Sequence, residues 1–222
     1  MTSPKSLQIG VMLEAVQLSD VIGIDILGSL SKTYIQSVVS SFPTDDSTIG
    51  PALLDLAPEI TIHFISSTLE AAHATPGLRF LPTTTYASCP LDLDLVLIGG
   101  PLPDHRPPAS IQFLKDVVSK GKDTTIMSVC TGGMWLADSG VLQGRKATAQ
   151  REVLGLLKVQ HPEVEWLDQR WVVDGNFWTA GGAGCGVDMI IAYIKERFDA
   201  RLVGLVLQAL QFGTDQGQLY KD

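Results

Sequence analysis

The chain has little positive charge, and charged residues of either sign are few. Of its 222 residues, 16 are Lys or Arg and 24 are Asp or Glu, and together the charged residues make up 18% of the sequence. The net charge of −8 argues against a nucleic-acid partner or an anionic membrane surface, because both attract basic proteins. Hydrophobic residues make up 45% of the chain, so we expect a sizeable folded core rather than disorder.

Long apolar runs, a secretion leader and a disulfide framework are also missing. The sequence has no apolar run of about 18 residues, so we expect no membrane span. Residues 1–6 lead directly into a strand-like segment and lack the apolar core and cleavage site of a signal peptide. The cysteines are Cys89, Cys130 and Cys185, an odd number at wide spacing, which does not fit paired disulfides. We therefore expect a reducing, cytoplasmic location.

Apolar patterns alternate with turn residues and predict alternating strands and helices. Strands are expected at 7–13, 60–66, 77–81, 82–86, 93–98, 124–129 and 146–149, with a hairpin of 166–173 and 177–180 around Asp174-Gly175. Helices are expected after a cap at Ser19 or Asp20, from a cap at Ser110 to Lys120, and at 132–138, 153–159 and 187–212, the last broken near Asp199. Residues 42–58, with a short helix at 52–56, form either a functional loop or a tolerated insertion.

This order of elements predicts an α/β fold. Strands that alternate with helices and end in Gly-rich turns imply a mostly parallel sheet with helices on both faces, and we expect residues 1–222 to form a single domain. Sites in such sheets form beyond the carboxyl ends of the strands. Three stretches should meet there: the loop with Asp20, the Gly99-Gly100 turn and the turn at Cys130.

The segment 126–133 (IMSVCTGG) is an apolar run that ends in small residues, and a helical pattern follows at once. A reactive side chain on a sharp strand-to-helix turn needs small neighbours, because the backbone there is crowded and often strained. The N–H groups and positive dipole end of the following helix favour a thiolate, which is the nucleophile. We therefore predict that Cys130 is reactive; a buried structural cysteine is the alternative.

Five segments are distinctive in their order and spacing: residues 17–25 (QLSDVIGID), 97–100 (LIGG), 128–132 (SVCTG), 137–148 (ADSGVLQGRKAT) and 179–188 (TAGGAGCGVD). Together they resemble the ThiJ/PfpI superfamily. The resemblance covers nearly the whole chain. It implies a flavodoxin-like fold similar to the class I glutamine amidotransferase domain, with Cys130 on a nucleophile elbow.

The resemblance also implies a pairing of two side chains. Members of the superfamily place an acidic residue of the first loop against the cysteine, and here that residue is Asp20. The combination of aspartate at position 20 and Cys-Thr-Gly at the elbow is most similar to the pattern of isonitrile hydratases and of the cysteine-bearing domain of some transcription regulators. No DNA-binding segment follows the last expected helix in this sequence, so we expect an enzyme, and the resemblance implies a homodimer.

The implied reaction is a cofactor-free hydration of a small molecule. Cys130 attacks the terminal carbon of an isonitrile, Asp20 supplies or relays a proton to give a thioimidate, and water then releases an N-substituted formamide. The Gly99-Gly100 turn is expected to contact substrate, and the backbone N–H groups of Gly100 and Thr131 to hold negative charge. The Thr131 hydroxyl either bonds substrate or simply belongs to a small residue at a helix start.

Two other functions stay open: glyoxalase III-type conversion of 2-oxoaldehydes to 2-hydroxy acids, and redox sensing through oxidation of Cys130. Many relatives carry histidine directly after the cysteine or near residue 150, where this chain has Thr131 and Gln150. A histidine-dependent triad is therefore poorly supported. His105 either reaches the mouth of the site or is a solvated loop residue.

Other residues have plainer interpretations. Cys185 at a helix start is expected to serve packing rather than catalysis, although its position favours a lowered pKa. His63 and His73 lack neighbours arranged for metal binding, so no metal site is expected. Glu14 is the other acidic residue near the first loop, but the surrounding pattern favours Asp20.

Overall fold

A mostly parallel sheet forms the centre of the computed structural model, which describes residues 3–41, 51–120, 123–212 and 218. The strands are β1 (Ser6–Met12), β2 (Glu59–Ser66), β3 (Ala72–Ala74), β4 (Leu78–Phe80), β5 (Thr84–Thr85), β6 (Leu95–Ile98), β7 (Thr125–Val129), β8 (Lys146–Ala147), β9 (Glu165–Trp166), β10 (Trp171–Asp174) and β11 (Phe177–Ala180). The helices are α1 (Gly23–Ser29), α2 (Lys32–Ser41), α3 (Pro108–Lys120), α4 (Gly132–Ser139), α5 (Leu154–Gln160), α6 (Ala183–Arg197) and α7 (Ala200–Leu210), with short 3-10 helices η1 (Leu18–Val21), η3 (Pro51–Leu53) and η4 (Arg151–Val153).

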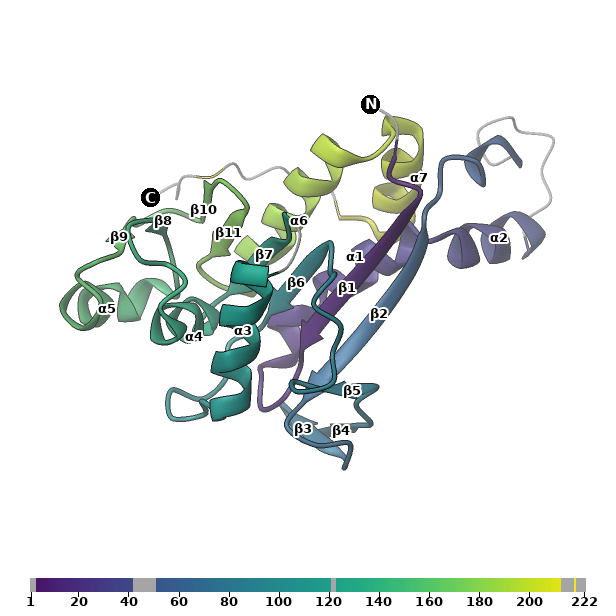
Figure 1. Ribbon diagram of the computed structural model, residues 1–222. Coiled ribbons are helices and arrows are strands. Elements are labelled where there is room, and N and C mark those ends of the chain that lie inside the picture. The colour runs from purple at the N-terminus through teal and green to yellow at the C-terminus, as the bar shows by residue number, and fades with distance from the viewer. Residues whose placement is uncertain (1–2, 42–50, 121–122, 213–217, 219–222) are drawn as a thin grey trace.

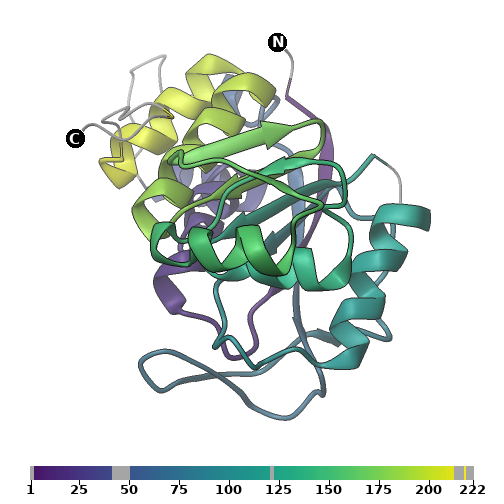
Figure 2. The ribbon, with the colours of Figure 1, turned by 90° about the vertical axis from the view of Figure 1, so that its left-hand side faces the viewer.

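The central sheet has seven strands in the order β10-β11-β7-β6-β1-β2-β5 (Figure 1). Neighbouring strands are parallel except for β10 and β11, which form the hairpin predicted around Gly175. Helices α1, α6 and α7 pack on one face, while α3 and α4 pack on the other (Figure 1 and Figure 2). The predicted α/β fold is confirmed, with β6 and β7 buried along their full length because helices cover both faces.

Several predicted boundaries also agree with the structure. Helix α4 ends before Gly140, whose φ of 78° allows the left-handed cap. The long C-terminal helix breaks at Asp199, whose carboxylate accepts a hydrogen bond from the backbone N–H of Arg201 and so caps α7. No helix in the described parts of the chain is both long and apolar enough to cross a membrane.

The strand pair predicted at 77–81 and 82–86 is wrong. Gly77, with a φ of 101°, reverses the chain one strand earlier, so β3 pairs with β4 in an antiparallel ribbon. The following segment docks along β2 instead: the N–H of Thr83 donates to the carbonyl of Phe64, and the N–H of Phe64 donates to Thr83 Oγ1. These bonds bring β5 beside β2 in parallel.

Both predicted helix caps are also wrong. Asp20 lies within η1, where its carboxylate bonds to a distant loop rather than to the helix start. Helix α3 begins at Pro108, and Ser110 lies inside it: its hydroxyl donates to the carbonyl of Pro107 and accepts from the indole of Trp135. Of the predicted loop at 42–58, residues 42–50 lie outside the described residues, and η3 occupies part of the expected short helix.

Candidate active site

Three loops converge at the carboxyl ends of β1, β6 and β7. The backbone N–H of Gln17, after β1, donates to the carbonyl of Gly100, after β6 (N–O distance 2.9 Å). The hydroxyl of Thr131, after β7, donates to the carbonyl of Pro101 (2.8 Å). These bonds hold the three predicted stretches together, so Asp20, Gly100 and Cys130 lie at one site.

Cys130 occupies a strained elbow. Its φ of 61° lies in the left-handed region, which for a residue with a side chain is unfavourable by about 1–3 kcal/mol. The turn is held from both sides: the N–H of Cys130 donates to the carbonyl of Ala180 (3.0 Å), and the carbonyl of Cys130 accepts from Gly133 (3.3 Å) and Gln150 (3.4 Å). The predicted strand-to-helix elbow is therefore present.

Steric crowding explains the small residues around the elbow. A Cβ atom at Gly132 would lie 2.7 Å from the carbonyl oxygen of Ile98, and one at Gly133 would lie 2.9 Å from the carbonyl oxygen of Thr148. Both contacts are with backbone, which cannot easily move aside. At these positions, glycine is what lets α4 start directly after the cysteine.

The Asp20 side chain is 3% exposed and faces the elbow. Its Oδ2 atom accepts a hydrogen bond from the backbone N–H of Gly100 (3.0 Å), while Oδ1 has no hydrogen-bond partner among the described residues. Burial raises the pKa of Asp20, and the bonds from Gly100 and Cys130 offset part of this rise. The carboxyl group is thus placed to exchange a proton with the thiol.

Gly100 and Gly99 make room for this pair. A Cβ atom at Gly100 would lie 2.6 Å from Thr131 Oγ1, 2.7 Å from Asp20 Oδ2 and 3.0 Å from Cys130 Cβ. A Cβ atom at Gly99 would lie 2.8 Å from Val21 Cγ1, so Gly99 allows η1 to approach β6. The N–H of Gly100, predicted to hold negative charge on a substrate, donates to Asp20 in this structure.

The expectation of a lowered Cys130 pKa is wrong. Burial, followed by the negative charge of Asp20, raises the pKa of Cys130 to about 11, although the backbone N–H and hydroxyl of Thr131 act in the opposite direction. The N-terminal end of α4 therefore lowers the pKa of Cys130 by less than burial and the neighbouring carboxylate raise it. With both pKa values raised, the Cys130–Asp20 pair retains a proton at neutral pH.

Gln150 is a further neighbour of Cys130. Cys130 Sγ lies 3.7 Å from Gln150 Oε1, in a geometry that lets the thiol donate to the amide oxygen. The sequence identified Gln150 only as a departure from histidine. The contact arises because the N–H of Gln150 bonds the carbonyl of Cys130, which fixes the segment beside the elbow.

The other candidates lie apart from this pair. Glu14 bonds Ser67 and approaches His105, so Asp20 and not Glu14 faces Cys130. Cys185 is 8% exposed in the first turn of α6, and burial raises the pKa of Cys89 to about 12. Among the described residues, no group of three or more His, Cys, Asp or Glu side chains is arranged to hold a metal ion.

A comparison with protein-family models identifies the family of this chain. The model of the DJ-1/PfpI family matches residues 48–196. The chain belongs to the DJ-1/PfpI family. Asp20 lies outside the matched residues, so its assignment rests on the geometry described above and on the resemblance of its loop.

Curated relatives of this DJ-1/PfpI protein differ in their activities. Isonitrile hydratase from Pseudomonas putida is 28% identical over 166 residues, which cover 70% of this chain and 67% of the relative. A deglycase from Pyrococcus horikoshii is 34% identical over 85 residues, covering 37% of this chain and 49% of the relative. The HTH-type transcriptional regulator CdhR from Pseudomonas aeruginosa is 26% identical over 106 residues, covering 48% and 31%.

Solved structures share the fold. A ThiJ/PfpI family protein from Pseudomonas syringae aligns with a TM-score of 0.71 and 21% identity, covering 96% of this chain and 78% of that one. Drosophila melanogaster DJ-1beta aligns with a TM-score of 0.65 and 17% identity, covering 96% and 100%. At these identities the likeness shows the fold alone.

Proposed function

We propose that this chain is a single-domain, cofactor-free cysteine enzyme that hydrates isonitriles to N-substituted formamides. The observation that carries the proposal is the geometry of one pair: a buried Asp20 carboxyl group lies against Cys130 on a strained elbow, where burial raises the pKa of both groups. Such a pair suits a reaction in which the cysteine sulfur and a proton are both added to one carbon atom. The isonitrile hydratase of Pseudomonas putida adds support, since its similarity covers 70% of this chain.

The first step forms a thioimidate. Cys130 Sγ bonds to the terminal carbon of the isonitrile, and the proton held by the Cys130–Asp20 pair moves to the same carbon, which gives R–N=CH–S. The Thr131 N–H, which already favours negative charge on the sulfur, supports the attacking thiolate. Proton and nucleophile arrive from adjacent groups, so no separate base is needed.

The second step releases the product. Asp20, now a carboxylate, accepts a proton from water as the water oxygen bonds to the thioimidate carbon, and it passes this proton to the imine nitrogen. The carbon–sulfur bond then breaks and its electron pair returns to Cys130. The second proton of the water leaves the new hydroxyl group, which becomes the formamide carbonyl, and returns to the Cys130–Asp20 pair. One isonitrile and one water give one N-substituted formamide.

The test is turnover of cyclohexyl isonitrile, with the formamide followed by NMR. We expect wild-type protein to produce the formamide and Cys130→Ala to produce none, with folding of both checked by circular dichroism. A folded wild-type protein that consumes no isonitrile overturns the proposal.

Conversion of a 2-oxoaldehyde to a 2-hydroxy acid is the second candidate. The unpartnered Oδ1 atom of Asp20 favours it, because this chemistry needs a base that moves a proton between neighbouring carbons of a hemithioacetal at Cys130. The deglycase relatives belong to the same family. Lactate formed from methylglyoxal, without isonitrile turnover, would assign this reaction instead.

A further inference from the structure

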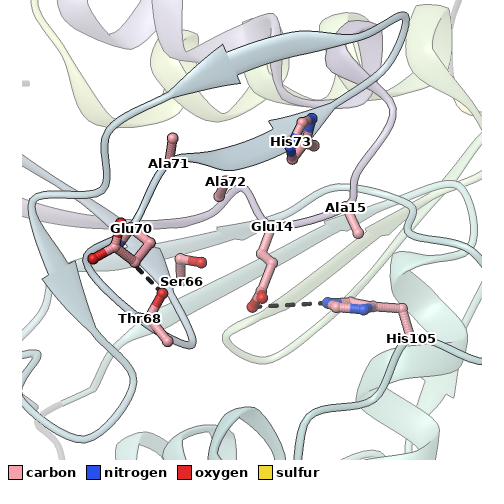
Figure 3. A pocket seen from close by; sticks show the side chains of 9 residues that line it. All are labelled: Glu14, Ala15, Ser66, Thr68, Glu70, Ala71, Ala72, His73 and His105. Atoms are coloured by element: carbon pink, nitrogen blue, oxygen red, sulfur yellow. Dashed lines mark hydrogen bonds and ion pairs between the residues drawn. The ribbon is translucent and has the colours of Figure 1, made fainter.

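A cavity lies at the same edge of the sheet as the elbow. Its polar lining consists of Glu14 after β1, Ser66 and Thr68 at the end of β2, Glu70, His73 in β3, and His105 in the loop after β6 (Figure 3). The cavity, here called the Glu14 pocket, has a volume of about 250 Å³. Neither Cys130 nor Asp20 lines it, so it is separate from the candidate active site.

The Glu14 carboxylate is the main charge in this pocket. Its Oε2 atom accepts hydrogen bonds from the N–H (3.0 Å) and hydroxyl (2.7 Å) of Ser67, and the side chain is 19% exposed. Its ion-pair contact in the described chain is His105, whose Nε2 lies 3.7 Å away, and the two side chains point toward each other (Figure 3). The lining contains Glu70 but no Lys or Arg among the described residues.

Polar atoms near Glu14 lack hydrogen-bond partners among the described residues. A separation of 3.7 Å is too long for a hydrogen bond, and the buried Nε2 atom of His105 has no hydrogen-bond partner in the described part of the chain. The Tyr86 hydroxyl, on a side chain that is 3% exposed, lies near Glu14 but makes no well-formed hydrogen bond. Buried polar groups without partners are uncommon and need an explanation.

The backbone beneath the pocket is also strained. Ala15 has a φ of 58°, and its N–H donates to the carbonyl of His73 (2.8 Å), which ties the loop after β1 to β3. A residue with a side chain in this conformation persists only where its surroundings fix it, and such residues cluster at binding sites. Here the bond holds the backbone next to Glu14 against His73, and both residues line the cavity.

The polar groups that line the Glu14 pocket indicate which class of ligand it can bind. Two carboxylates exclude an anion, and the carboxylate, imidazole and hydroxyl acceptors suit a donor with several N–H groups. The described residues offer no cluster of three metal-ligating side chains, which disfavours a metal ion. The volume is below the roughly 300–1,000 Å³ of drug-sized sites, so the ligand is small.

We propose that the Glu14 pocket binds a small organic cation through its primary ammonium group, with Glu14 and His105 accepting the N–H bonds. This assignment goes beyond the reaction at Cys130 and does not depend on it. Binding is therefore measured directly, without any activity assay.

The experiment compares three probes of similar size: n-butylammonium, n-butanol and butyrate. Each is titrated into isotope-labelled wild-type protein at pH 7.5 and followed by NMR chemical shifts. We expect butylammonium alone to saturate, with a Kd in about the millimolar range for so few atoms, and shifts centred on Glu14, His73 and His105. Glu14→Gln should weaken binding by about tenfold or more.

The matched control is Glu59→Gln, which removes an exposed carboxylate at the other end of β2 and should leave the Kd unchanged. Equal binding of butanol, an unchanged Kd in Glu14→Gln, or tighter binding of Zn²⁺ than of butylammonium overturns the proposal, as does absence of saturation at tens of millimolar. If Glu14→Gln does not fold, the comparison of the three probes on wild-type protein decides.

Discussion

Asp20 and Glu14 both lie between β1 and α1, Glu14 in the loop directly after β1 and Asp20 in η1, yet they face different neighbours. Asp20 is 3% exposed, accepts one bond from the backbone of Gly100 and touches a thiol. Glu14 is 19% exposed, accepts two bonds from Ser67 and faces an imidazole. The carboxyl group of Asp20 thus lies beside a thiol with which it can exchange a proton, whereas the carboxyl group of Glu14 accepts hydrogen bonds from Ser67. The surroundings of the two carboxyl groups, rather than their positions in the chain, are therefore the basis for proposing a reaction at Asp20 and ligand binding at Glu14.

The largest expected contrast is in turnover. Asp20→Asn keeps the acceptor for Gly100 but removes the titrating proton, so we expect kcat/KM for isonitrile to fall by about 10²–10⁴-fold. Glu14→Gln should change it by less than about threefold, since Glu14 does not contact the elbow. Equal losses in the two variants would show that both carboxylates serve the reaction.

Crowding at Gly100 gives the next effect. Gly100→Ala places a Cβ against Thr131, Asp20 and Cys130, so we expect a loss of stability of about 1–3 kcal/mol and a fall in turnover. Gly28→Ala is the matched control, because a Cβ there meets nothing within 4 Å, and in α1 it should stabilise by about 0.5–1 kcal/mol. Urea unfolding measures both. A Gly100→Ala protein of unchanged stability would refute the packing described for the site.

A third prediction concerns the reactivity of the thiol at different pH. The charge of Asp20 raises the pKa of Cys130, so Asp20→Asn should lower this pKa from about 11 and increase the thiolate fraction at any pH below it. We expect alkylation by iodoacetamide near pH 8 to become up to about tenfold faster. Glu14→Gln should leave the rate unchanged.

Alkylation of Cys130→Ala provides the background from Cys89 and Cys185, which are buried. Slower alkylation of Asp20→Asn would mean that Asp20 carries the proton and donates to a thiolate in the resting protein. That outcome would reverse the assignment of the shared proton while leaving the pair intact.

The smallest expected effect is at Gln150. Gln150→Ala removes one neutral acceptor of the thiol at 3.7 Å, a contact that contributes about 0.5–1.5 kcal/mol, so we expect a twofold to tenfold fall in kcat/KM. Gln150→Glu preserves the size but adds a second negative charge, which should raise the pKa of Cys130 further. A wild-type alkylation profile in Gln150→Glu would show that the side chain does not face the sulfur.

The central strands of the sheet and the elbow at Cys130 could be predicted from the sequence. Strands buried on both faces, such as β6 and β7, require continuous apolar runs, and these are visible without any contact information. The elbow is visible because Gly132 and Gly133 are needed wherever a helix starts against a neighbouring backbone. Both signals are local in the chain.

The errors concern groups that only the fold brings together. The pairing of β3 with β4 depends on the turn at Gly77, and each of these strands has three residues, too few for a periodicity that would mark its partner. The pKa of Cys130 depends on Asp20, which arrives from another loop and opposes the helix end. The Glu14 pocket combines three loops, and no spacing along the chain indicates that His105 will lie opposite Glu14.

The left-handed backbone of Cys130 has a consequence for how this chain evolves. Glycine is the residue that adopts a φ of 61° without strain, so Cys130→Gly would relax the turn while removing the sulfur. At this one position, selection for stability alone and selection for chemistry favour different residues. If Cys130 is the nucleophile that we propose, copies of the chain that no longer need the reaction are expected to drift toward glycine at position 130 and to relieve the strain of this turn.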